Sequence, residues 1–474
     1  MKIILIHNKI FLDSKILITT IIISMFLIPA FGQTFDDEIT DAGLGHLVKE
    51  GQKPNVLDAS FTVDEFTSGL SFPTTMAFID NDILVLQKHD GQVRHVLPDG
   101  TLLPNVVLDV HVSNQMERGL LGITSKNSFV YLYYTESIQD GGDPIGNNIY
   151  KYKWLDNKLQ DPILLKSLPA YNDATVHQGG VMTVGKDGTV YAIIGDQSNI
   201  DSVRGANILQ NQFGPPDDSG VIIPVEPTGP YYAIGIRNSF GLTIDPVTGN
   251  MWATENGPHR MDEVNLVMPK FNSGWDAHTG PISESQISKL IAINQYLADV
   301  GGVFKSHIQI FLTGIYSIFL LTDNYEYSDP EFSWEKVIAP TALDFAPSSF
   351  VKYENWLFVG DCNFGNIYKF KLNSDRNGFV FEDFHLNDLV LHEEDNIEEI
   401  LFGEGFGCIT DIEIRGDDMY VVSIFDGTIY RIFLKDLSWL RKMNTLTELW
   451  FIIINHFFQR INCFMLVIEA CRQQ

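Results

Sequence analysis

His177 and Asp196 stand at the two ends of a predicted β-hairpin. Apolar runs at residues 181–184 and 190–194 flank the turn sequence Lys-Asp-Gly at 186–188, which accepts the positive φ of a tight hairpin. Because a hairpin brings its ends together, the imidazole and the carboxylate can meet at one edge of a small sheet. A carboxylate that orients a histidine makes it a better general base. The alternative is a surface histidine beside a turn aspartate.

A second polar set lies on either side of another predicted strand. Arg237 stands at the start of this strand, where a guanidinium can polarise a carbonyl or hold an anion. A salt bridge to Glu255 or Asp262 is its alternative role. Acidic residues and a Gly-Pro turn follow the strand, and carboxylates with backbone carbonyls are the ligands that calcium takes. The expected oxygen donors are Glu255, Asp262, Glu263 and the carbonyls of the turn Gly257-Pro258.

The elements that position these residues come from a pattern that recurs along the chain. Apolar alternation, a turn with Asp or Gly, a strand rich in Tyr, Trp or Leu and a second turn follow one another in each copy. The copies begin at Met76, Gly119, His177, Gly241, Leu343 and Asp411. No copy can bury both its faces alone, so we expect an all-β fold, a six-bladed β-propeller with loop insertions. An irregular sandwich or two smaller sheets is the alternative. In a propeller the loops converge at one face, where a site would be built.

The N-terminal segment has the features of a secretory signal. Lysines at positions 2, 9 and 15 precede an apolar stretch at residues 16–29, and small residues up to Gly32 complete the pattern. Cleavage is expected near Gly32, with an uncleaved anchor as the alternative. Both interpretations predict a secreted or cell-surface protein.

The remaining chain divides by pattern. We expect a signal peptide at 1–32, an N-terminal lead at 33–65, the propeller at 66–436 with an insertion at about 283–325, and an apolar tail at 437–474. Each apolar run of the tail is too short to span a bilayer. Membrane association is therefore expected only through an uncleaved N-terminus or this tail.

Composition limits the class of protein. The 474 residues are 45% hydrophobic and 12% aromatic with 38 glycines, which suits many short strands and tight turns. The formal net charge of −28 makes nucleic acid an unsuitable partner, since phosphate binding needs local positive charge.

The four cysteines, at positions 362, 408, 463 and 471, show no Cys-x-x-Cys spacing and so indicate no zinc site. A Cys362–Cys408 disulfide and a pair of buried free thiols are both open.

Five motifs in one order resemble the glucose/sorbosone dehydrogenase family, over about residues 66–434. They are ERGLLG at 117–122, HQGG at 177–180 with GDQ at 195–197, GIRN at 235–238, ENGP at 255–258 and DEVNL at 262–266. The resemblance implies a soluble aldose dehydrogenase on a six-bladed propeller, with pyrroloquinoline quinone (PQQ) and calcium as cofactors. It also implies a sugar substrate oxidised at its anomeric carbon and an external electron acceptor.

The resemblance assigns roles to individual residues. His177 matches the base that takes the sugar's proton, Asp196 the carboxylate that orients it, and Arg237 the group that polarises the quinone oxygen. The matching polar cofactor contacts are Gln178, Asn238 and Asn256. The carbonyls of Gly257 and Pro258 match ligands of the calcium beside the cofactor, and Glu263 matches a ligand of a second, structural calcium.

Two loops depart from the family's pattern. Glucose oxidisers of this family place lysine and arginine in the fifth and sixth blades to hold the cofactor's carboxylates. The matching loops here, DCNFG at 361–365 and EGFGC at 404–408, contain neither. Each charge-assisted hydrogen bond lost in this way is worth about 1.5 to 3 kcal/mol. The alternatives to a dehydrogenase are therefore a cofactor-free propeller that binds carbohydrate or protein, and a calcium-dependent hydrolase of the lactonase type.

Overall fold

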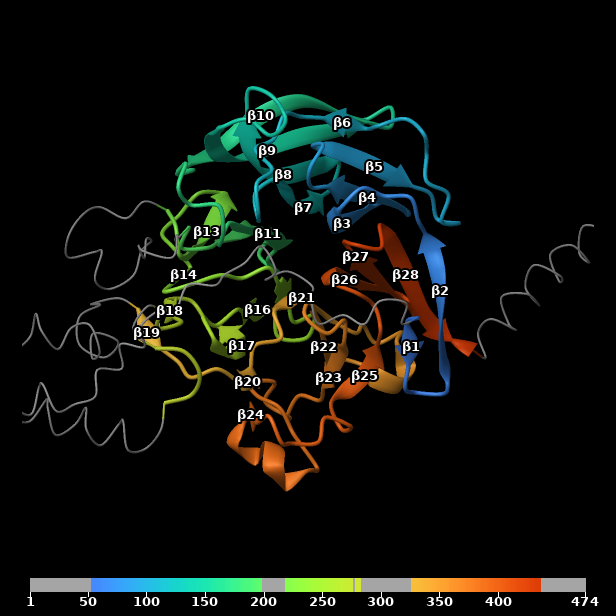
Figure 1. Ribbon diagram of the computed structural model, residues 1–474, viewed down its shortest axis with the longest axis vertical. Helices are drawn as coiled ribbons and strands as arrows, with labels where there is room; N and C mark the ends of the chain where they lie inside the picture. Colours follow the sequence, from blue (N-terminus) through green and yellow to red (C-terminus); the bar gives the residue numbers. More distant parts are fainter. Residues whose placement is uncertain (1–52, 198–217, 276–277, 283–324, 436–474) are drawn as a thin grey trace, which may run out of the picture. The chain divides into compact units, whose positions relative to one another are not determined.

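The described part of the chain consists of β-strands joined by turns and two short 3₁₀ helices. The computed structural model describes residues 53–197, 218–275, 278–282 and 325–435. Within these ranges the strands form six sheets of four to six strands each, arranged around a common centre (Figure 1). The two 3₁₀ helices are η1 (Val351–Tyr353) and η2 (Phe384–Asp388).

The first two sheets and the first four strands of the third follow the chain in order. The first has the order β3-β4-β5-β6, with β3 (Pro73–Ile79), β4 (Asp82–Gln87), β5 (Gln92–Val96) and β6 (Leu108–Asp109). The second has the order β7-β8-β9-β10, with β7 (Leu120–Lys126), β8 (Phe129–Ser137), β9 (Pro144–Leu155) and β10 (Lys158–Leu168). The third has the order β11-β12-β13-β14-β18-β19, with β11 (Gly179–Val184), β12 (Val190–Ile194), β13 (Val221–Glu226), β14 (Ala233–Ile234), β18 (Phe271–Asn272) and β19 (Glu326–Tyr327).

The other three sheets include strands from distant parts of the chain. The fourth has the order β15-β16-β17-β20-β24, with β15 (Leu242–Ile244), β16 (Met251–Glu255), β17 (Arg260–Val267), β20 (Phe332–Lys336) and β24 (Val390–Leu391). The fifth has the order β21-β22-β23-β25-β1, with β21 (Pro340–Phe345), β22 (Leu357–Asp361), β23 (Ile367–Phe370), β25 (Leu401–Glu404) and β1 (Asn55–Val56). The sixth has the order β26-β27-β28-β2, with β26 (Ile409–Arg415), β27 (Asp418–Ser423), β28 (Thr428–Leu434) and β2 (Phe61–Thr67).

The innermost strands connect neighbouring sheets. Strand β3 contacts β7, β7 contacts β11, β11 contacts β15, β15 contacts β21, β21 contacts β26, and β26 contacts β3 again. Each of the six sequence copies supplies the inner strands of a different sheet. The expected all-β, propeller-like arrangement is therefore confirmed.

The last sheet is completed by the start of the described chain. Strand β2 pairs antiparallel with β28, from Phe61 opposite Leu434 to Thr67 opposite Ile429. Strand β1 likewise pairs with β25. Sheet formation thus begins within the segment expected as an N-terminal lead, earlier than residue 66. The physical reason is that β28 would otherwise present an unpaired edge, and a strand from the other end of the chain covers it.

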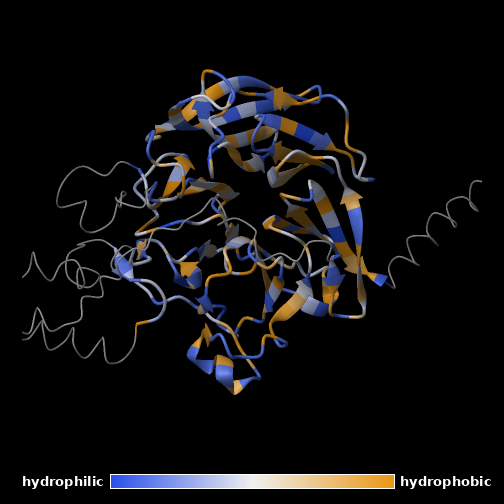
Figure 2. Ribbon diagram, viewed as in Figure 1, coloured by the Kyte–Doolittle hydropathy of each residue, from blue (hydrophilic) through white to orange (hydrophobic). Residues whose placement is uncertain are grey.

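Apolar side chains fill the spaces between neighbouring sheets. One cluster joins Trp252 and Phe332 of the fourth sheet to Phe370 and Leu357 of the fifth. Hydrophobic and hydrophilic residues alternate along many strands, as Figure 2 shows. Each sheet therefore buries both faces only because two neighbours cover it, as expected from the repeats.

Several expected segments lie outside the described residues. These are the signal segment at 1–32, nearly all of the insertion at about 283–325, and the apolar tail at 437–474. Within the described ranges, no helix has the length and apolar character needed to cross a membrane.

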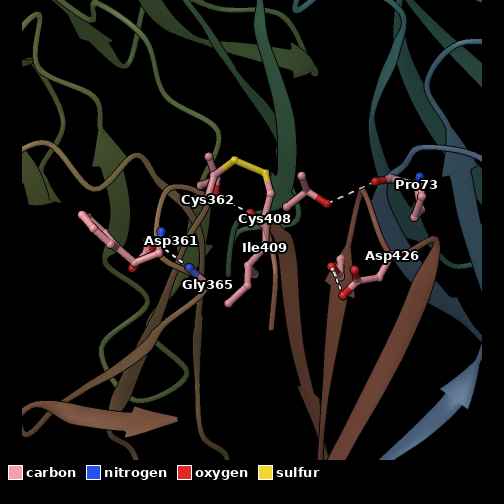
Figure 3. The surroundings of a disulfide bond; sticks show 11 residues. Pro73, Asp361, Cys362, Gly365, Cys408, Ile409 and Asp426 are labelled. Carbon is pink, nitrogen blue, oxygen red and sulfur yellow. Dashed lines mark hydrogen bonds between the residues drawn. A yellow bond between two sulfur atoms is a disulfide. The ribbon is translucent and has the colours of Figure 1, made fainter. Parts of the chain in front are cut away.

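A disulfide joins Cys362, which follows β22, to Cys408, which precedes β26 (Figure 3). The sequence left this pair open between a disulfide and free thiols. In the structure the bond cross-links the loops of the fifth and sixth sheets, and Cys463 and Cys471 lie outside the described residues.

Replacing both cysteines, as in Cys362→Ser with Cys408→Ser, should lower the free energy of unfolding by up to about 4 kcal/mol, because the bond spans 46 residues and restricts the unfolded chain. Denaturant unfolding with and without a reductant checks this. The reductant should destabilise the wild type and leave the double variant unchanged. Equal stability of the two proteins would contradict a formed disulfide.

Three acidic side chains lie on the adjacent inner strands β21 and β26. Burial raises the pKa of Asp344 to about 6 and that of Asp411 to about 7. Burial and then the charges of Asp344 and Asp411 raise the pKa of Glu413. Backbone N–H groups satisfy part of the cluster, since Met76 donates to Asp411 Oδ2 at 2.7 Å and Ile414 donates to Asp344 Oδ2 at 2.8 Å.

This cluster predicts a pH dependence of stability. An acid whose pKa is higher in the folded state binds its proton more tightly there than in the unfolded chain. For Asp411 the unfolded pKa is 3.8 and the folded pKa is about 7, so the free energy of unfolding falls as the pH rises between these two values. Asp411→Asn should therefore reduce the loss of unfolding free energy between pH 5 and pH 8 by roughly 2 to 3 kcal/mol. Asp99→Asn, at an exposed turn, is the control. An unchanged pH profile in Asp411→Asn would show that this carboxyl ionises without cost.

Candidate active site

The structure brings His177 and Asp196 together at the two ends of the β11–β12 hairpin. His177 Nδ1 lies 2.7 Å from Asp196 Oδ1, with Asp196 fully buried and the imidazole 12% exposed. When Nδ1–H donates to the carboxylate, the neutral ring carries its lone pair on Nε2. The pair can therefore take up a proton at Nε2.

The backbone at His177 is held in an unusual conformation. Its φ of 59° lies in the left-handed region, which residues with a side chain rarely adopt. The N–H of His177 donates to Glu117 Oε2 at 2.6 Å, and its carbonyl accepts from Gln197 N at 3.2 Å. Gly180 then passes so close to Tyr133 that a Cβ would lie 2.1 Å from the ring. These contacts fix the direction of the imidazole.

Glu117 belongs to the site although no role was assigned to it from the sequence. Besides His177, its carboxylate accepts from Asn238 Nδ2 at 3.3 Å. It comes from the segment before β7, so it links the second sheet to the residues before β11 and β15. The motif at 117–122 marks this segment, but a contact to a backbone N–H leaves no sequence pattern.

Trp275 is a second residue that sequence reasoning missed. Its indole Nε1 donates to Asp196 Oδ2 at 2.6 Å, so both oxygens of the buried carboxylate are hydrogen-bonded. The guanidinium of Arg237 lies 5.2 Å from the centre of the Trp275 ring, within the range of a cation–π contact. One side chain thus positions both Asp196 and Arg237.

Arg237 is held by backbone carbonyls. Nη1 donates to the carbonyl of Asn256 at 2.8 Å and to that of Gly257 at 3.2 Å. Glu255 accepts from the backbone N–H of Arg237 at 2.7 Å. Burial lowers the pKa of Arg237, and the charges of nearby acids, Asp196 first, oppose that change. The cation is therefore compensated by several acids rather than by one salt bridge.

The side chains of the three expected cofactor contacts differ in the hydrogen bonds they make within the protein. Gln178 is buried and donates to the carbonyls of Ala174 and Val176 at 2.9 Å, so it fastens the loop before His177. Asn238 bonds Glu117, as above. Asn256 Oδ1 is buried without a hydrogen-bond partner among the described residues. Among these three residues, Asn256 therefore has a side-chain oxygen that could accept a hydrogen bond from a ligand.

The expected calcium ligands lie in the fourth sheet, with Gly257 and Pro258 in the β16–β17 turn and Glu263 on β17. The carbonyl of Gly257, which Pro258 follows, accepts from Arg237 as described. Glu263 is buried and accepts from Gly280 N at 2.5 Å and Asn265 Nδ2 at 3.0 Å. Burial raises its pKa to about 7. Among the described residues, no group of three or more His, Cys, Asp or Glu side chains is placed to hold a metal.

The loops of the fifth and sixth sheets carry no cation of their own, although Lys336 Nζ lies 4.9 Å from the centre of the Phe364 ring. Their sequences at 361–365 and 404–408 contain no Lys or Arg, and the Cys362–Cys408 bond connects them (Figure 3). Asp361 Oδ1 accepts from the N–H groups of Phe364 at 2.6 Å and Gly365 at 2.9 Å. Burial raises the pKa of Asp361 to about 7. A hydrogen-bonded carboxyl and a disulfide therefore stand where cations were expected from the resemblance.

Known proteins share parts of this sequence. An uncharacterized protein of Synechocystis is 28% identical over 238 residues, which cover 44% of this chain and 57% of that protein, less than two thirds of its length. Quinoprotein glucose dehydrogenase B of Acinetobacter calcoaceticus is 23% identical over 361 residues, covering 62% of this chain and 73% of that one.

The fold is also shared with solved structures. The PQQ-bound aldose sugar dehydrogenase of Streptomyces coelicolor superposes with a TM-score of 0.53 at 18% identity, covering 81% of this chain and all of that one. The family model described as glucose/sorbosone dehydrogenase matches residues 70–290, the region that contains His177, Asp196, Arg237 and the Glu255–Glu263 segment. The resemblance to the glucose/sorbosone dehydrogenase family, inferred from the five motifs, is therefore confirmed.

Proposed function

We propose that this protein is a PQQ- and calcium-dependent dehydrogenase that oxidises an aldose sugar at its anomeric carbon and passes the electrons to an external acceptor. The observation that carries the proposal is the pair His177–Asp196, fastened by Trp275 next to Arg237. A general base beside a buried cation suits a reaction that removes a proton and a hydride from one alcohol.

His177 would act as the base. Its Nε2 takes the proton of the sugar hydroxyl, and Asp196 at Nδ1 stabilises the imidazolium that forms. Because the second oxygen of Asp196 is held by Trp275, the carboxylate cannot rotate away from the ring. The base is therefore oriented before substrate binds.

Arg237 would stabilise negative charge close to the base. Its guanidinium is buried, and its Nε has no hydrogen-bond partner among the described residues. In a buried site such a donor interacts more strongly than it would in water. When bound, the quinone supplies the acceptor for the hydride. Arg237 and Asn256 would contact it. The carbonyls of Gly257 and Pro258 would supply ligands for a calcium beside the cofactor, and Glu263 would supply a ligand for a second calcium.

The wider assignments follow from the same proposal. We take the six sheets as six blades of one propeller, since the inner strands contact one another in a closed order. A secreted or cell-surface location rests on the sequence of residues 1–32.

A cofactor-free propeller that binds carbohydrate is the second candidate. The loops at 361–365 and 404–408 favour it, because they offer a tricarboxylate the carboxyl of Asp361 and no Lys or Arg of their own. Quinone titration of the calcium-loaded protein, followed by absorbance, separates the two candidates. Saturable binding supports the dehydrogenase, and no binding supports the second candidate.

Replacing the base, as in His177→Ala, should lower kcat of the quinone-loaded enzyme with aldoses by about 10² to 10⁴ while the fold is retained. Asp196→Asn should act on the same step, so the double variant should be less impaired than the product of the single effects. Steady-state kinetics and circular dichroism check this. His385→Ala is a matched control, since His385 pairs with Asp383 at an exposed position. If His177→Ala oxidised aldoses at the wild-type rate, His177 would not be the base.

Calcium binding should stabilise the folded protein, because a ligand that binds only the folded state shifts unfolding by about 2.7 kcal/mol at a hundredfold excess over Kd. Chelation should lower the Tm, and added calcium should restore it. Glu263→Gln should reduce this response. A Tm that is insensitive to chelation in the wild type would argue against the calcium site.

A further inference from the structure

A cavity lies between the first and sixth sheets, at the ends of their inner strands and away from the candidate site. Inner strands begin on the side of the site, as β7 does after Glu117, β11 after His177 and β26 after Cys408. The cavity is lined by Phe78, near the end of β3, and by Arg415, the last residue of β26. The seven residues of β26 span about 20 Å. The cavity is therefore separate from the residues of the proposed reaction.

The size of the cavity suits a small ligand. Its volume is about 270 Å³, slightly below the roughly 300 to 1,000 Å³ of sites that take drug-sized molecules. Strands β3, β26 and β27, which meet beside it, belong to neighbouring sheets (Figure 1). Its lining includes three aromatic rings, a cation and an amide, which are Phe66, Phe78, Tyr420, Arg415 and Asn81.

The three rings form an ordered cluster. Tyr420 meets Phe66 edge-on at 5.1 Å and Phe78 edge-on at 5.4 Å. Ser125 Oγ donates to the carbonyl of Phe78 at 2.6 Å, which holds the backbone of that residue. Gly100 passes so close to Phe66 that a Cβ would lie 2.1 Å from its carbonyl oxygen. Rings fixed in this way lose little freedom when a ligand binds.

Arg415 adds a positive charge that the described residues do not pair. Its guanidinium lies 4.6 Å from the centre of the Phe78 ring and forms no ion pair or hydrogen bond with them. Arg431 of the same sheet differs, since it pairs with Asp64 at 2.8 Å. Burial and then the charges of nearby acids raise the pKa of Glu413, two residues before Arg415, which favours its neutral form. The charge of Arg415 is therefore available to a ligand.

Asn81 supplies a second donor at the cavity. It is exposed in the turn between β3 and β4, and its side-chain amide forms no hydrogen bond with the described residues. Guanidinium groups bind carboxylates through two parallel N–H donors, and aromatic rings pack against other aromatic rings. The lining thus matches a molecule that carries both a ring and a carboxylate.

We propose that this cavity binds a small aromatic carboxylate. The ring of the ligand packs among Phe66, Phe78 and Tyr420, and its carboxylate pairs with Arg415 and accepts from the amide of Asn81. The net charge of −28 makes an unpaired cation beside an apolar cavity a selective position for an anion. None of these residues belongs to the candidate active site, so the proposal goes beyond the proposed function and does not rest on it.

Phenylacetate is the first probe, with phenylacetamide as its uncharged counterpart and acetate as its counterpart without a ring. Benzoate and indoleacetate test smaller and larger rings. Ligand-observed NMR titration of the full chain, without added quinone, measures each affinity. Phenylacetate should bind saturably, phenylacetamide about tenfold more weakly and acetate not detectably. Added salt should weaken phenylacetate binding, because Arg415 is exposed.

Variants assign the binding to the cavity. Arg415→Gln should weaken phenylacetate binding about tenfold and leave phenylacetamide binding unchanged. Phe78→Leu, which removes the ring and keeps an apolar side chain, should weaken the binding of both. Asn81→Ala should weaken phenylacetate binding about threefold. Thermal unfolding identifies any variant that fails to fold, and Arg415 and Asn81 are exposed positions at which the fold should be retained.

The chain offers a matched control for the loss of charge. Lys158 is an exposed cation at the start of β10, in the second sheet. Lys158→Gln removes the same charge as Arg415→Gln and should leave every titration unchanged.

Each outcome decides the proposal. No saturable binding of any of the three aromatic acids, equal affinity for phenylacetate and phenylacetamide, or equal losses in Lys158→Gln and Arg415→Gln would overturn it. Binding that is lost in His177→Ala and retained in Arg415→Gln would place the ligand at the candidate active site and overturn it as well. Binding that depends on Arg415 in a protein without dehydrogenase activity would support the cavity and reject only the proposed function.

Discussion

The buried carboxylate of Asp196 is the group on which the site depends. A fully buried charge is costly unless hydrogen bonds and a nearby cation compensate it. Here His177 binds one oxygen, Trp275 binds the other, and the N–H of Asp196 donates to the carbonyl of Arg237. These partners come from β-strand ends and loops of different segments, so satisfying one carboxylate holds them in a single arrangement. The base, its orienting acid and the cation are thereby fixed before any ligand arrives.

The sequence alone was sufficient to predict that His177 lies near Asp196, because the two residues flank a single β-hairpin. The strands of this hairpin lie where the apolar runs predicted them. Contacts between sheets were not accessible in this way. Glu117 reaches a backbone N–H of His177, and Trp275 reaches Asp196 from a segment after β18, and neither contact has a spacing that a single sequence reveals. The Cys362–Cys408 bond is similar, since the two residues meet only when the fifth and sixth sheets lie side by side. The closing strand β2 carried only a partial signal, because FTVDEFT alternates over its first four residues and then breaks at Glu65, where its pairing with β28 shifts register.

Asp262 connects the site to the disulfide. Its Oδ1 accepts from Gly257 N at 2.7 Å, and its Oδ2 accepts from Ile338 N and Ala339 N at 2.6 and 2.8 Å. The carbonyl of Ala339 then accepts from Cys362 N at 3.0 Å. Burial raises the pKa of Asp262 to about 6, and the three N–H donors oppose that change. Asp262 thus joins two segments by hydrogen bonds. One is the turn at Gly257, which contacts Arg237, and the other is the segment before β21, which contacts Cys362 of the disulfide.

The distribution of charge around the site is uneven, and this limits how an anionic ligand can be oriented. Arg237 supplies positive charge on the side of the fourth sheet, and Lys88, whose pKa burial lowers to about 8, lies near Glu117 on the side of the first. On the side of the fifth sheet, Asp361 already occupies the N–H groups of Phe364 and Gly365. An anionic group directed there would meet Asp361 and not those donors, and the cation beside this loop is the exposed Lys336, whose Nζ lies 4.9 Å from the centre of the Phe364 ring. Negative charge in this region is therefore better compensated on the side of Arg237 than on the side of Asp361.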